Sequence, residues 1–314
     1  MRVVFMGTPD FALKSLQTLY ESGRAIAGVF TRPDKPRGRN RRVTAGPVKQ
    51  FAAENGIPVF QPETLRDGQA LETLKELAPE VIAVVAYGKL LPPEILSLPP
   101  RGCVNIHGSL LPKYRGAAPV QRAIMGGEKT TGVTSIFMSS ELDAGDIILS
   151  KETPIADEET FGELYDRLGG MGAELLSETI DLIADGLARG APQDHSLASF
   201  APPISGNDEM IDWAATGDEI IRAIRALNPR PAAAAVFGGA RFKIYEAKRA
   251  SAAARAGAPG DVLREGGDGV EVACGDGAVI ITQLQAPGGA RMSARDYLLG
   301  HTLQRPASRE GART

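Results

Sequence analysis

Two polar side chains, Asn105 and His107, stand out in the stretch CVNIHGSLLPKYRGAAP, which covers residues 103–119. In a β-strand, residues two apart point to the same face, and their Cα atoms lie about 6.6 Å apart. An amide and an imidazole placed in this way could act on one small substrate group. The alternative is that both are ordinary polar residues at the end of a strand.

The strand runs into a loop, Ser109 to Gly116, that contains a proline, a glycine and the guanidinium of Arg115. We expect this loop to be rigid, because the proline ring fixes one backbone dihedral. With exposed backbone donors and a guanidinium, it could grip a planar ring and an anion.

Asp143 and Asp146 flank Gly145 at a turn after the next predicted strand. The order of the strands could bring this turn against His107. A carboxylate beside an imidazole orients the ring and favours its protonated form. The alternative is that these are ordinary turn aspartates, which is the favoured interpretation for Asp146.

Cys103 shares the face of Asn105 and His107, which raises the possibility of a Cys and His nucleophile pair. Four residues of strand separate Cys103 from His107 by about 13 Å, whereas a nucleophile and its base need about 3 Å. We therefore interpret Cys103 as a small core residue. With two cysteines and three scattered histidines, a metal site is not expected.

Positive charge is concentrated in residues 32–49, which hold seven Lys and Arg residues against one acid, or +6, in a chain whose net charge is −3. This density of cations is typical of a surface that binds a phosphodiester backbone. No aromatic residue lies among them to stack on bases. A flexible charged surface loop is the alternative. The predicted nucleic-acid-binding residues are Arg32, Lys35, Arg37, Arg39, Arg41, Arg42 and Lys49.

Apolar runs alternate with helical patterns through the first half of the chain, which predicts a doubly wound, mostly parallel α/β sheet of the Rossmann type. The pattern G-x-G-x-x-G of dinucleotide-binding loops is missing. After His107 the strands at 133–138 and 142–151 predict an antiparallel extension. Short glycine-punctuated strands near the C-terminus predict a small β-barrel. We expect domains at residues 1–189 and 208–314, joined by a proline-rich linker at 190–207.

The composition is that of an ordinary soluble protein, with 43% hydrophobic and 23% charged residues. The first residues contain too short an apolar run for a signal peptide, and no run approaches the length of a membrane span. We therefore expect a cytoplasmic protein. No apolar stripe demands a partner chain, so we also expect a monomer.

Two of these motifs, NIHGSLLPKYRGAAP at 105–119 and GVTSIFMSSELDAGDI at 132–147, resemble the signature of the folate-dependent formyltransferases. Further matches extend the resemblance over nearly the whole chain: FMGTPDFA at 5–12, AYG at 86–88, PDKPRGR at 33–39, IDW at 211–213 and NPRP at 228–231. The chain departs from the usual pattern at Asn40, Ser139, Ser140 and Glu141.

The resemblance implies a formyl donor, 10-formyltetrahydrofolate, and a C-terminal barrel similar to an OB-fold that binds tRNA. The acceptor it implies is the α-amino group of initiator methionyl-tRNA, with the basic loop on the acceptor stem. The catalytic residues it implies are Asn105, His107 and Asp143. The folate-binding residues it implies are Ser109, Leu110, Leu111 and Pro112.

Two other functions remain open at this point. A formyltransferase acting on the amine of a nucleotide-linked sugar would use the same chemistry, but it would need neither the basic loop nor a second barrel domain. A noncatalytic RNA-binding protein would use the basic loop and the barrel alone, and would leave the Asn, His and Asp residues unexplained.

Overall fold

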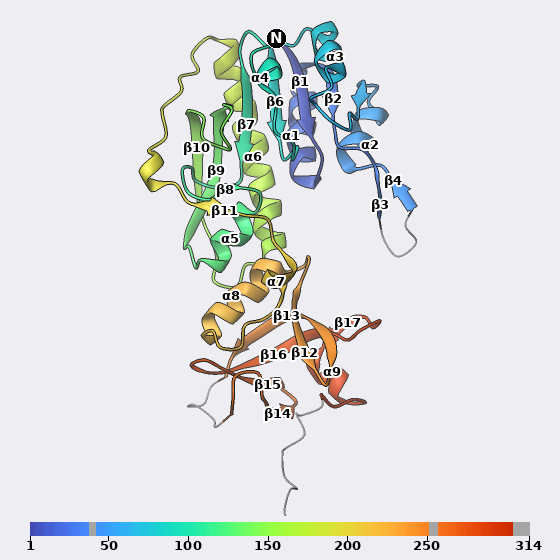
Figure 1. The fold of residues 1–314 in the computed structure, drawn as a ribbon, viewed down its shortest axis with the longest axis vertical. Helices are drawn as coiled ribbons and strands as arrows, with labels where there is room; N and C mark the ends of the chain where they lie inside the picture. Colours follow the sequence, from blue (N-terminus) through green and yellow to red (C-terminus); the bar gives the residue numbers. More distant parts are fainter. Residues whose placement is uncertain (38–41, 251–256, 304–314) are drawn as a thin grey trace, which may run out of the picture. The chain divides into compact units, whose positions relative to one another are not determined.

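The structure is a computed structural model that describes residues 1–37, 42–250 and 257–303 (Figure 1). The chain divides into two compact units. Unit 1 contains Met1–Pro119, Thr130–Pro154 and Leu164–Pro202, and unit 2 contains Val120–Lys129, Ile155–Glu163 and Pro203–Thr314. The domain limits expected from the sequence stay a prediction.

Unit 1 is built on a seven-stranded sheet with the order β10-β9-β7-β6-β1-β2-β5. Five neighbouring strands are parallel, whereas β9 runs antiparallel to β7 and to β10. The doubly wound, mostly parallel sheet and its antiparallel extension are thereby confirmed. The strands are β1 (Arg2–Gly7), β2 (Ala25–Phe30), β5 (Val59–Phe60), β6 (Val81–Val85), β7 (Cys103–His107), β9 (Thr130–Phe137) and β10 (Ile147–Pro154).

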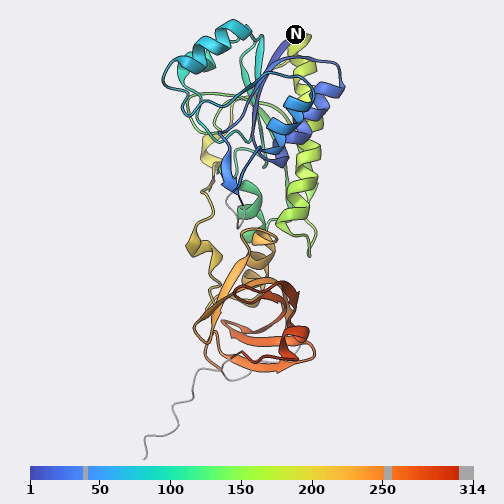
Figure 2. The same cartoon turned by 90° about the vertical axis from the view of Figure 1, so that its right-hand side faces the viewer.

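Helices cover both faces of this sheet, which is why β1 and β6 are almost continuously apolar. In Figure 2, α1 (Asp10–Glu21) and α6 (Phe161–Ala184) lie on one side of the sheet and α3 (Gln69–Leu77) lies on the other. On the α3 side, α4 (Pro93–Leu96) completes a core that includes Leu74, Ile95, Met6 and Cys103.

Smaller elements of unit 1 lie in the connections. They are the two-stranded ribbon β3 (Lys35–Arg37) and β4 (Arg42–Thr44), the helix α2 (Pro47–Glu54), the parallel pair β8 (Arg115–Gly116) and β11 (Phe200–Ala201), and the short 3-10 helix η1 (His195–Leu197). Both strands of the pair β8 and β11 border the predicted site, although they are 85 residues apart in the chain.

Unit 2 is a six-stranded antiparallel sheet with the path β12-β13-β16-β15-β14, to which β17 is added at β16. It fits the small barrel predicted from the sequence. The strands are β12 (Ala233–Phe237), β13 (Ala240–Arg249), β14 (Val262–Gly266), β15 (Gly269–Cys274), β16 (Gly277–Gln285) and β17 (Arg291–Ser293). Its helices are α5 (Pro119–Met125, of which Val120 onward belongs to this unit), α7 (Gly206–Glu209), α8 (Gly217–Leu227) and α9 (Ala294–Leu298).

Helix α3 begins at Gln69, directly after Gly68, whose backbone is left-handed with φ of 79°. The strands of the antiparallel extension begin elsewhere than the sequence predicts, since β9 begins at Thr130 instead of residue 133. The strand expected from residue 142 begins at Ile147, because Asp143 has a φ of 49° in the preceding turn. Within the described residues, no helix is long and apolar enough to cross a membrane.

Asp208 ties together two segments of unit 2 that are distant in the chain. Its carboxylate accepts hydrogen bonds from the backbone N–H and hydroxyl of Ser205, which caps α7. It also accepts a 2.6 Å hydrogen bond from Arg122 in α5. These donors lower the pKa of Asp208 well below its usual range, with the Arg122 hydrogen bond as the largest cause. The folded state is therefore stabilised most when this group is ionised.

We predict that Asp208→Asn destabilises unit 2 by about 1–2 kcal/mol at pH 7, because it removes the charge and part of the cap. A carboxyl whose pKa is lowered by folding stabilises the fold above its unfolded pKa of about 4 and stops doing so as the pH falls through its folded value. The deficit relative to the wild type should therefore shrink in melts at pH 3. As a control, Asp157→Asn removes the exposed pair with Lys129 and should leave the melting temperature unchanged. Equal melting temperatures for Asp208→Asn and the wild type at pH 7 would contradict the prediction.

Candidate functional site

Asn105 and His107 lie on β7, the last parallel strand before the sheet turns antiparallel. Strand geometry points both side chains to the same face, as predicted. His107 pairs in register with Thr134 of β9 and is 6% exposed. Asn105 is half-buried, and its amide has no hydrogen-bond partner within the described part of the chain. The amide donor is therefore available to a ligand.

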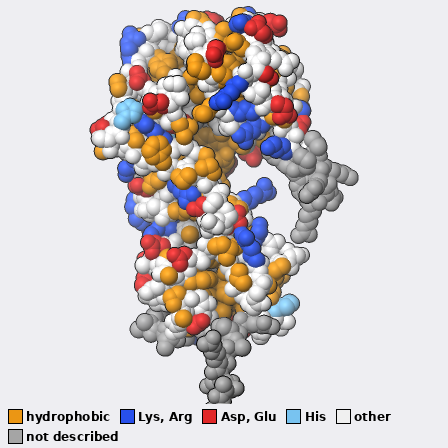
Figure 3. Space-filling model, in the orientation of Figure 1, with side chains coloured by type: hydrophobic (Ala, Val, Ile, Leu, Met, Phe, Trp, Pro, Cys, Tyr) orange, Lys and Arg blue, Asp and Glu red, His pale blue; other side chains and the backbone are white. Residues whose placement is uncertain are grey.

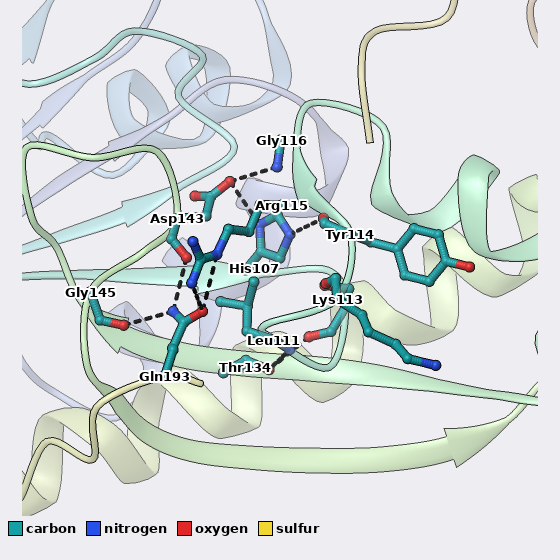
Figure 4. Close-up of polar contacts among 11 residues, drawn as sticks. His107, Leu111, Lys113, Tyr114, Arg115, Gly116, Thr134, Asp143, Gly145 and Gln193 are labelled. Carbon is teal, nitrogen blue, oxygen red and sulfur yellow. Dashed lines mark hydrogen bonds and ion pairs between the residues drawn. The ribbon is translucent and has the colours of Figure 1, made fainter. Parts of the chain in front are cut away.

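The His107 ring is held on its Nε2 side by the backbone carbonyl of Tyr114, 2.8 Å away (Figure 4). A carbonyl oxygen only accepts hydrogen bonds, so Nε2 carries a proton. In the neutral ring Nδ1 then holds the lone pair. This nitrogen faces Asp143, whose Oδ2 is 3.6 Å away, too far for a hydrogen bond. Nδ1 is therefore the atom of the ring that is ready to take up a proton.

Asp143 is brought to His107 by the turn between β9 and β10. Its Oδ2 accepts a 2.8 Å hydrogen bond from the backbone N–H of Gly116, and its side chain is 14% exposed. The turn is tight, since a Cβ on Gly145 would lie 1.7 Å from the carbonyl oxygen of Phe137. Asp146, in contrast, is exposed, as the turn interpretation expects.

Two non-glycine residues beside the ring have left-handed backbones, Tyr114 with φ of 60° and Asp143 with φ of 49°. Each costs about 1 kcal/mol or more. Tyr114 supplies the acceptor for Nε2, and Asp143 supplies the carboxylate facing Nδ1. Such strain persists only where the surroundings impose it, so both residues require support from neighbouring segments.

The predicted folate-binding residues lie in an internally hydrogen-bonded loop, in which Ser109 and Leu111 are buried and Leu110 and Pro112 are half-buried. Ser109 is fully buried, and its hydroxyl donates to the Lys113 carbonyl at 2.7 Å. The hydroxyl of Thr134, also fully buried, donates to the Ser109 carbonyl and accepts from the Leu111 N–H. Pro112 follows Leu111 through a cis peptide bond. The side chains of Lys113 and Tyr114 extend away from His107 in Figure 4.

Arg115 corrects one expectation from the sequence. We expected its guanidinium to be free to grip an anion, but the residue is 5% exposed and the side chain points inward. Its Nε and Nη2 donate to the Gln193 amide oxygen at 3.1 and 2.6 Å, and Nη1 lies 3.3 Å from Nδ1 of His195. Arg115 is therefore occupied within the protein.

Cys103 is a core residue, as expected. It is 3% exposed, packs with α4, and its Sγ lies 3.7 Å from the Ile95 carbonyl. Burial raises the pKa of the Cys103 thiol to about 12, so the thiolate needed for nucleophilic chemistry does not form near neutral pH. Among the described residues no group of His, Cys, Asp and Glu could hold a metal ion.

The basic residues lie apart from His107 along the chain, on and around the ribbon of β3 and β4. Lys49 donates to Asp34 at 2.5 Å and to Gln61 at 2.6 Å, and Arg32 donates to the Gly88 carbonyl. Lys35 is exposed. Arg39 and Arg41 lie outside the described residues, and only the backbone is described for Arg37 and Arg42. Figure 3 shows Lys and Arg side chains gathered on this face of unit 1.

The sequence of this chain matches two models of a known protein family. The family model described as formyl transferase matches residues 1–180, and the model of its C-terminal domain matches residues 203–302. The chain belongs to the formyl transferase family. The resemblance inferred from the motifs around His107 and Asp143 is thereby confirmed.

Two curated relatives within this family match almost end to end. The methionyl-tRNA formyltransferase of Moorella thermoacetica is 48% identical over 96% of this chain and 97% of its own length. The methionyl-tRNA formyltransferase of Pelotomaculum thermopropionicum is 47% identical over 96% of both chains. At this identity and coverage, both units of this formyl transferase have counterparts in the relatives.

A solved structure shares the fold at much lower identity. The N-formyltransferase from Helicobacter canadensis, in complex with folinic acid and dTDP-3-aminofucose, has a TM-score of 0.68 and 20% identity over 89% of this chain and 98% of its own. At this identity the likeness concerns the fold alone.

Sequence reasoning missed three polar side chains that hold this site together: Gln193, Ser199 and Thr134. Gln193 and Ser199 lie in the stretch expected to be a linker, and their partners are 48 to 85 residues away. Local periodicity carries no signal of contacts at this separation. Thr134 lies opposite His107 in the register of β7 and β9, which the structure supplies and the sequence does not.

We predict that Gly145→Ala displaces the turn that carries Asp143, because the new Cβ overlaps the Phe137 carbonyl oxygen. The variant should melt at a lower temperature than the wild type. The matched control is Gly170→Ala in α6, where a Cβ meets nothing within 4 Å. That change should stabilise the protein by about 0.5–1 kcal/mol, because alanine favours helix more than glycine does. Thermal melts of both variants test this, and a Gly145→Ala protein as stable as the wild type would refute it.

Proposed function

We propose that this protein transfers the formyl group of 10-formyltetrahydrofolate to the α-amino group of initiator methionyl-tRNA, giving formylmethionyl-tRNA for translation initiation. The observation that carries the proposal is the arrangement of His107 Nδ1 facing Asp143 Oδ2 at 3.6 Å, on the strand that carries Asn105. Two relatives named methionyl-tRNA formyltransferase, which are 47% and 48% identical over 96% of the chain, support the choice of acceptor.

The reaction moves a formyl group from one nitrogen to another. The amine attacks the formyl carbon, which becomes tetrahedral and bears a negatively charged oxygen. The bond to the folate nitrogen then breaks, the amine loses a proton, and the folate nitrogen gains one. The site must therefore stabilise an oxyanion and move a proton.

Asn105 stabilises the oxyanion in this scheme. Its amide is half-buried and has no hydrogen-bond partner within the described residues, so its N–H groups can point at a charge that develops during the reaction. A donor that is in place before the charge forms needs no rearrangement, which makes such donors effective in a water-poor site.

His107 takes the proton from the attacking amine at Nδ1. The Tyr114 carbonyl keeps the other ring nitrogen protonated, so Nδ1 is the acceptor. Asp143 lies beside Nδ1 and stabilises the imidazolium that forms. The proton then passes to the leaving folate nitrogen, so the pair returns to its starting state.

Ser109, Leu110, Leu111 and Pro112 bind the folate in this proposal. The hydrogen bonds from Ser109 and Thr134 hold the loop in one conformation, which lowers the entropy lost on binding. No metal enters the scheme. We further propose a cytoplasmic monomer whose domains extend over residues 1–189 and 208–314, with the C-terminal barrel binding tRNA.

The basic residues bind the acceptor stem of the tRNA: Arg32, Lys35, Arg37, Arg39, Arg41, Arg42 and Lys49. Because Lys49 already pairs with Asp34, the remaining cations contribute more to phosphate binding. A sugar acceptor is the second candidate, because the N-formyltransferase from Helicobacter canadensis is in complex with dTDP-3-aminofucose. It is disfavoured because it gives the basic loop no role.

We predict that the wild-type protein formylates charged initiator tRNA in the presence of 10-formyltetrahydrofolate and leaves dTDP-linked amino sugars unmodified. Asn105→Ala and His107→Ala should lower turnover by about 10²- to 10³-fold, the usual cost of losing one transition-state contact. Initial rates with each acceptor measure both effects. Formylation of the sugar but not of the tRNA would overturn the proposed acceptor.

A matched control for these variants is Cys103→Ala, which changes the same face of β7 two residues from Asn105. It should keep wild-type turnover, because Cys103 packs in the core and its thiol takes no part in the scheme. Circular dichroism of all three variants checks that they fold. A folded His107→Ala protein with wild-type turnover would remove His107 from the mechanism.

We predict that replacing Arg39, Arg41 and Arg42 together by Ala weakens tRNA binding and reduces the slope of log Kd against log salt by about 2–3 units, since each phosphate contact contributes nearly one unit. The affinity for folate should not change. Replacing the exposed Arg66, Lys75 and Arg189 by Ala is the control and should leave the slope unchanged. Titrations at several salt concentrations measure the slopes, and equal slopes for the loop variant and the wild type would identify the loop as an ordinary charged surface.

A further inference from the structure

Residues 190–201, which we call the strap, run along the segments that surround His107. At one end, Ala191 and Ile147 exchange two backbone hydrogen bonds of 2.8 Å. At the other end, β11 pairs in parallel with β8. Side chains between these ends reach the two residues that face the nitrogens of the His107 ring. All of these contacts lie within unit 1.

Gln193 holds the turn that carries Asp143. Its Nε2 donates to the carbonyl of Asp143 at 2.9 Å and to that of Gly145 at 2.7 Å (Figure 4). The residue is 5% exposed, so water hardly competes for these hydrogen bonds. Both ends of the left-handed turn are therefore fixed by one amide group.

Arg115 fixes the orientation of this amide. Its guanidinium donates to Oε1 of Gln193, so the amide nitrogen must point the opposite way, toward the turn. A reversed amide would place its N–H groups against the N–H groups of a buried cation. Arg115 thus acts on Asp143 through Gln193.

Ser199 holds the other partner of the ring. Its hydroxyl accepts a 2.9 Å hydrogen bond from the N–H of Tyr114, and its carbonyl accepts a 2.8 Å hydrogen bond from the N–H of Arg115. Tyr114 is the residue whose carbonyl accepts from His107 Nε2. Gln193 and Ser199 therefore support the two groups that face the two ring nitrogens.

We propose that the strap is part of the catalytic apparatus and that Gln193 and Ser199 are positioning residues: Gln193 sets the place of Asp143 opposite Nδ1, and Ser199 sets the Tyr114 carbonyl that determines which nitrogen of His107 is protonated. This inference rests on the proposed function for its effect on turnover. The effect of the strap on which nitrogen of His107 is protonated does not depend on the reaction.

Two replacements at position 193 separate the contacts of that side chain. Gln193→Met removes all of them at nearly constant size. Gln193→Glu keeps the acceptor for Arg115 but has no N–H to donate, and its second oxygen would face the carbonyls of Asp143 and Gly145. If Gln193 acts through the turn, both variants should lower kcat by about 10- to 100-fold, as expected for a misplaced catalytic group, while KM for the formyl donor stays within about twofold.

Position 199 offers rescue by a conservative change. Ser199→Ala removes the acceptor for the Tyr114 N–H and should lower kcat, whereas Ser199→Thr keeps the hydroxyl and should restore it. The matched control is Ser196→Ala, which removes an exposed hydroxyl of the strap that bonds only within its own turn, to Asp194. This variant should turn over like the wild type.

Nitrogen NMR of the histidine rings measures the protonation and proton exchange of His107 Nε2 in the absence of substrates. The chain has three histidines, so His195→Gln and His301→Gln assign the His107 signals. The wild type should show a protonated, slowly exchanging Nε2, and Ser199→Ala should speed that exchange while Ser196→Ala does not. Wild-type kcat in both Gln193 variants, or unchanged Nε2 exchange in Ser199→Ala, would overturn the inference. Inactivity of the wild type toward methionyl-tRNA, with the NMR result intact, would overturn the proposed function alone.

Discussion

The hydrogen bond from His107 Nε2 to the Tyr114 carbonyl is the interaction on which the site depends. It fixes the tautomer of a nearly buried ring and turns the other nitrogen toward Asp143. Both residues that face the ring, Tyr114 and Asp143, have positive φ angles, a backbone conformation that residues other than glycine rarely adopt. The loop after β7, the turn after β9 and the strap are therefore all needed to hold one imidazole. The chemistry is concentrated on a strand, while the support comes from three connections.

Much of the fold is readable from the sequence because its signals are local. The buried runs of β1 and β6, the strand that carries Asn105 and His107, and the antiparallel pair after it all follow from short apolar patterns. The start of β10 differs from the prediction, because Asp143, a single residue with a left-handed backbone, lies in the turn that precedes this strand.

The residues that hold the site in place cannot be predicted from such local patterns. Arg115 reads in the sequence as an exposed cation of a loop, and what turns it inward is an amide 78 residues later. Gln193 lies among prolines and polar residues in which apolar side chains follow no regular spacing. A contact with a residue so far along the chain leaves no pattern in the surrounding sequence. The sequence therefore points to the groups proposed to react but not to the residues that hold them. The protonated nitrogen of His107 likewise follows from the position of one carbonyl, which only the structure supplies.

Unit 2 is not a continuous piece of chain. The chain leaves unit 1 after Pro119, returns at Thr130, leaves again after Pro154, returns at Leu164 and leaves finally after Pro202. Arg122 and Asp208, for example, belong to the same unit although 86 residues separate them in the chain. The chain therefore passes between the two units at several points, and no single break in the backbone separates them. A fragment that began at residue 203 would therefore lack α5 and the salt bridge between Arg122 and Asp208.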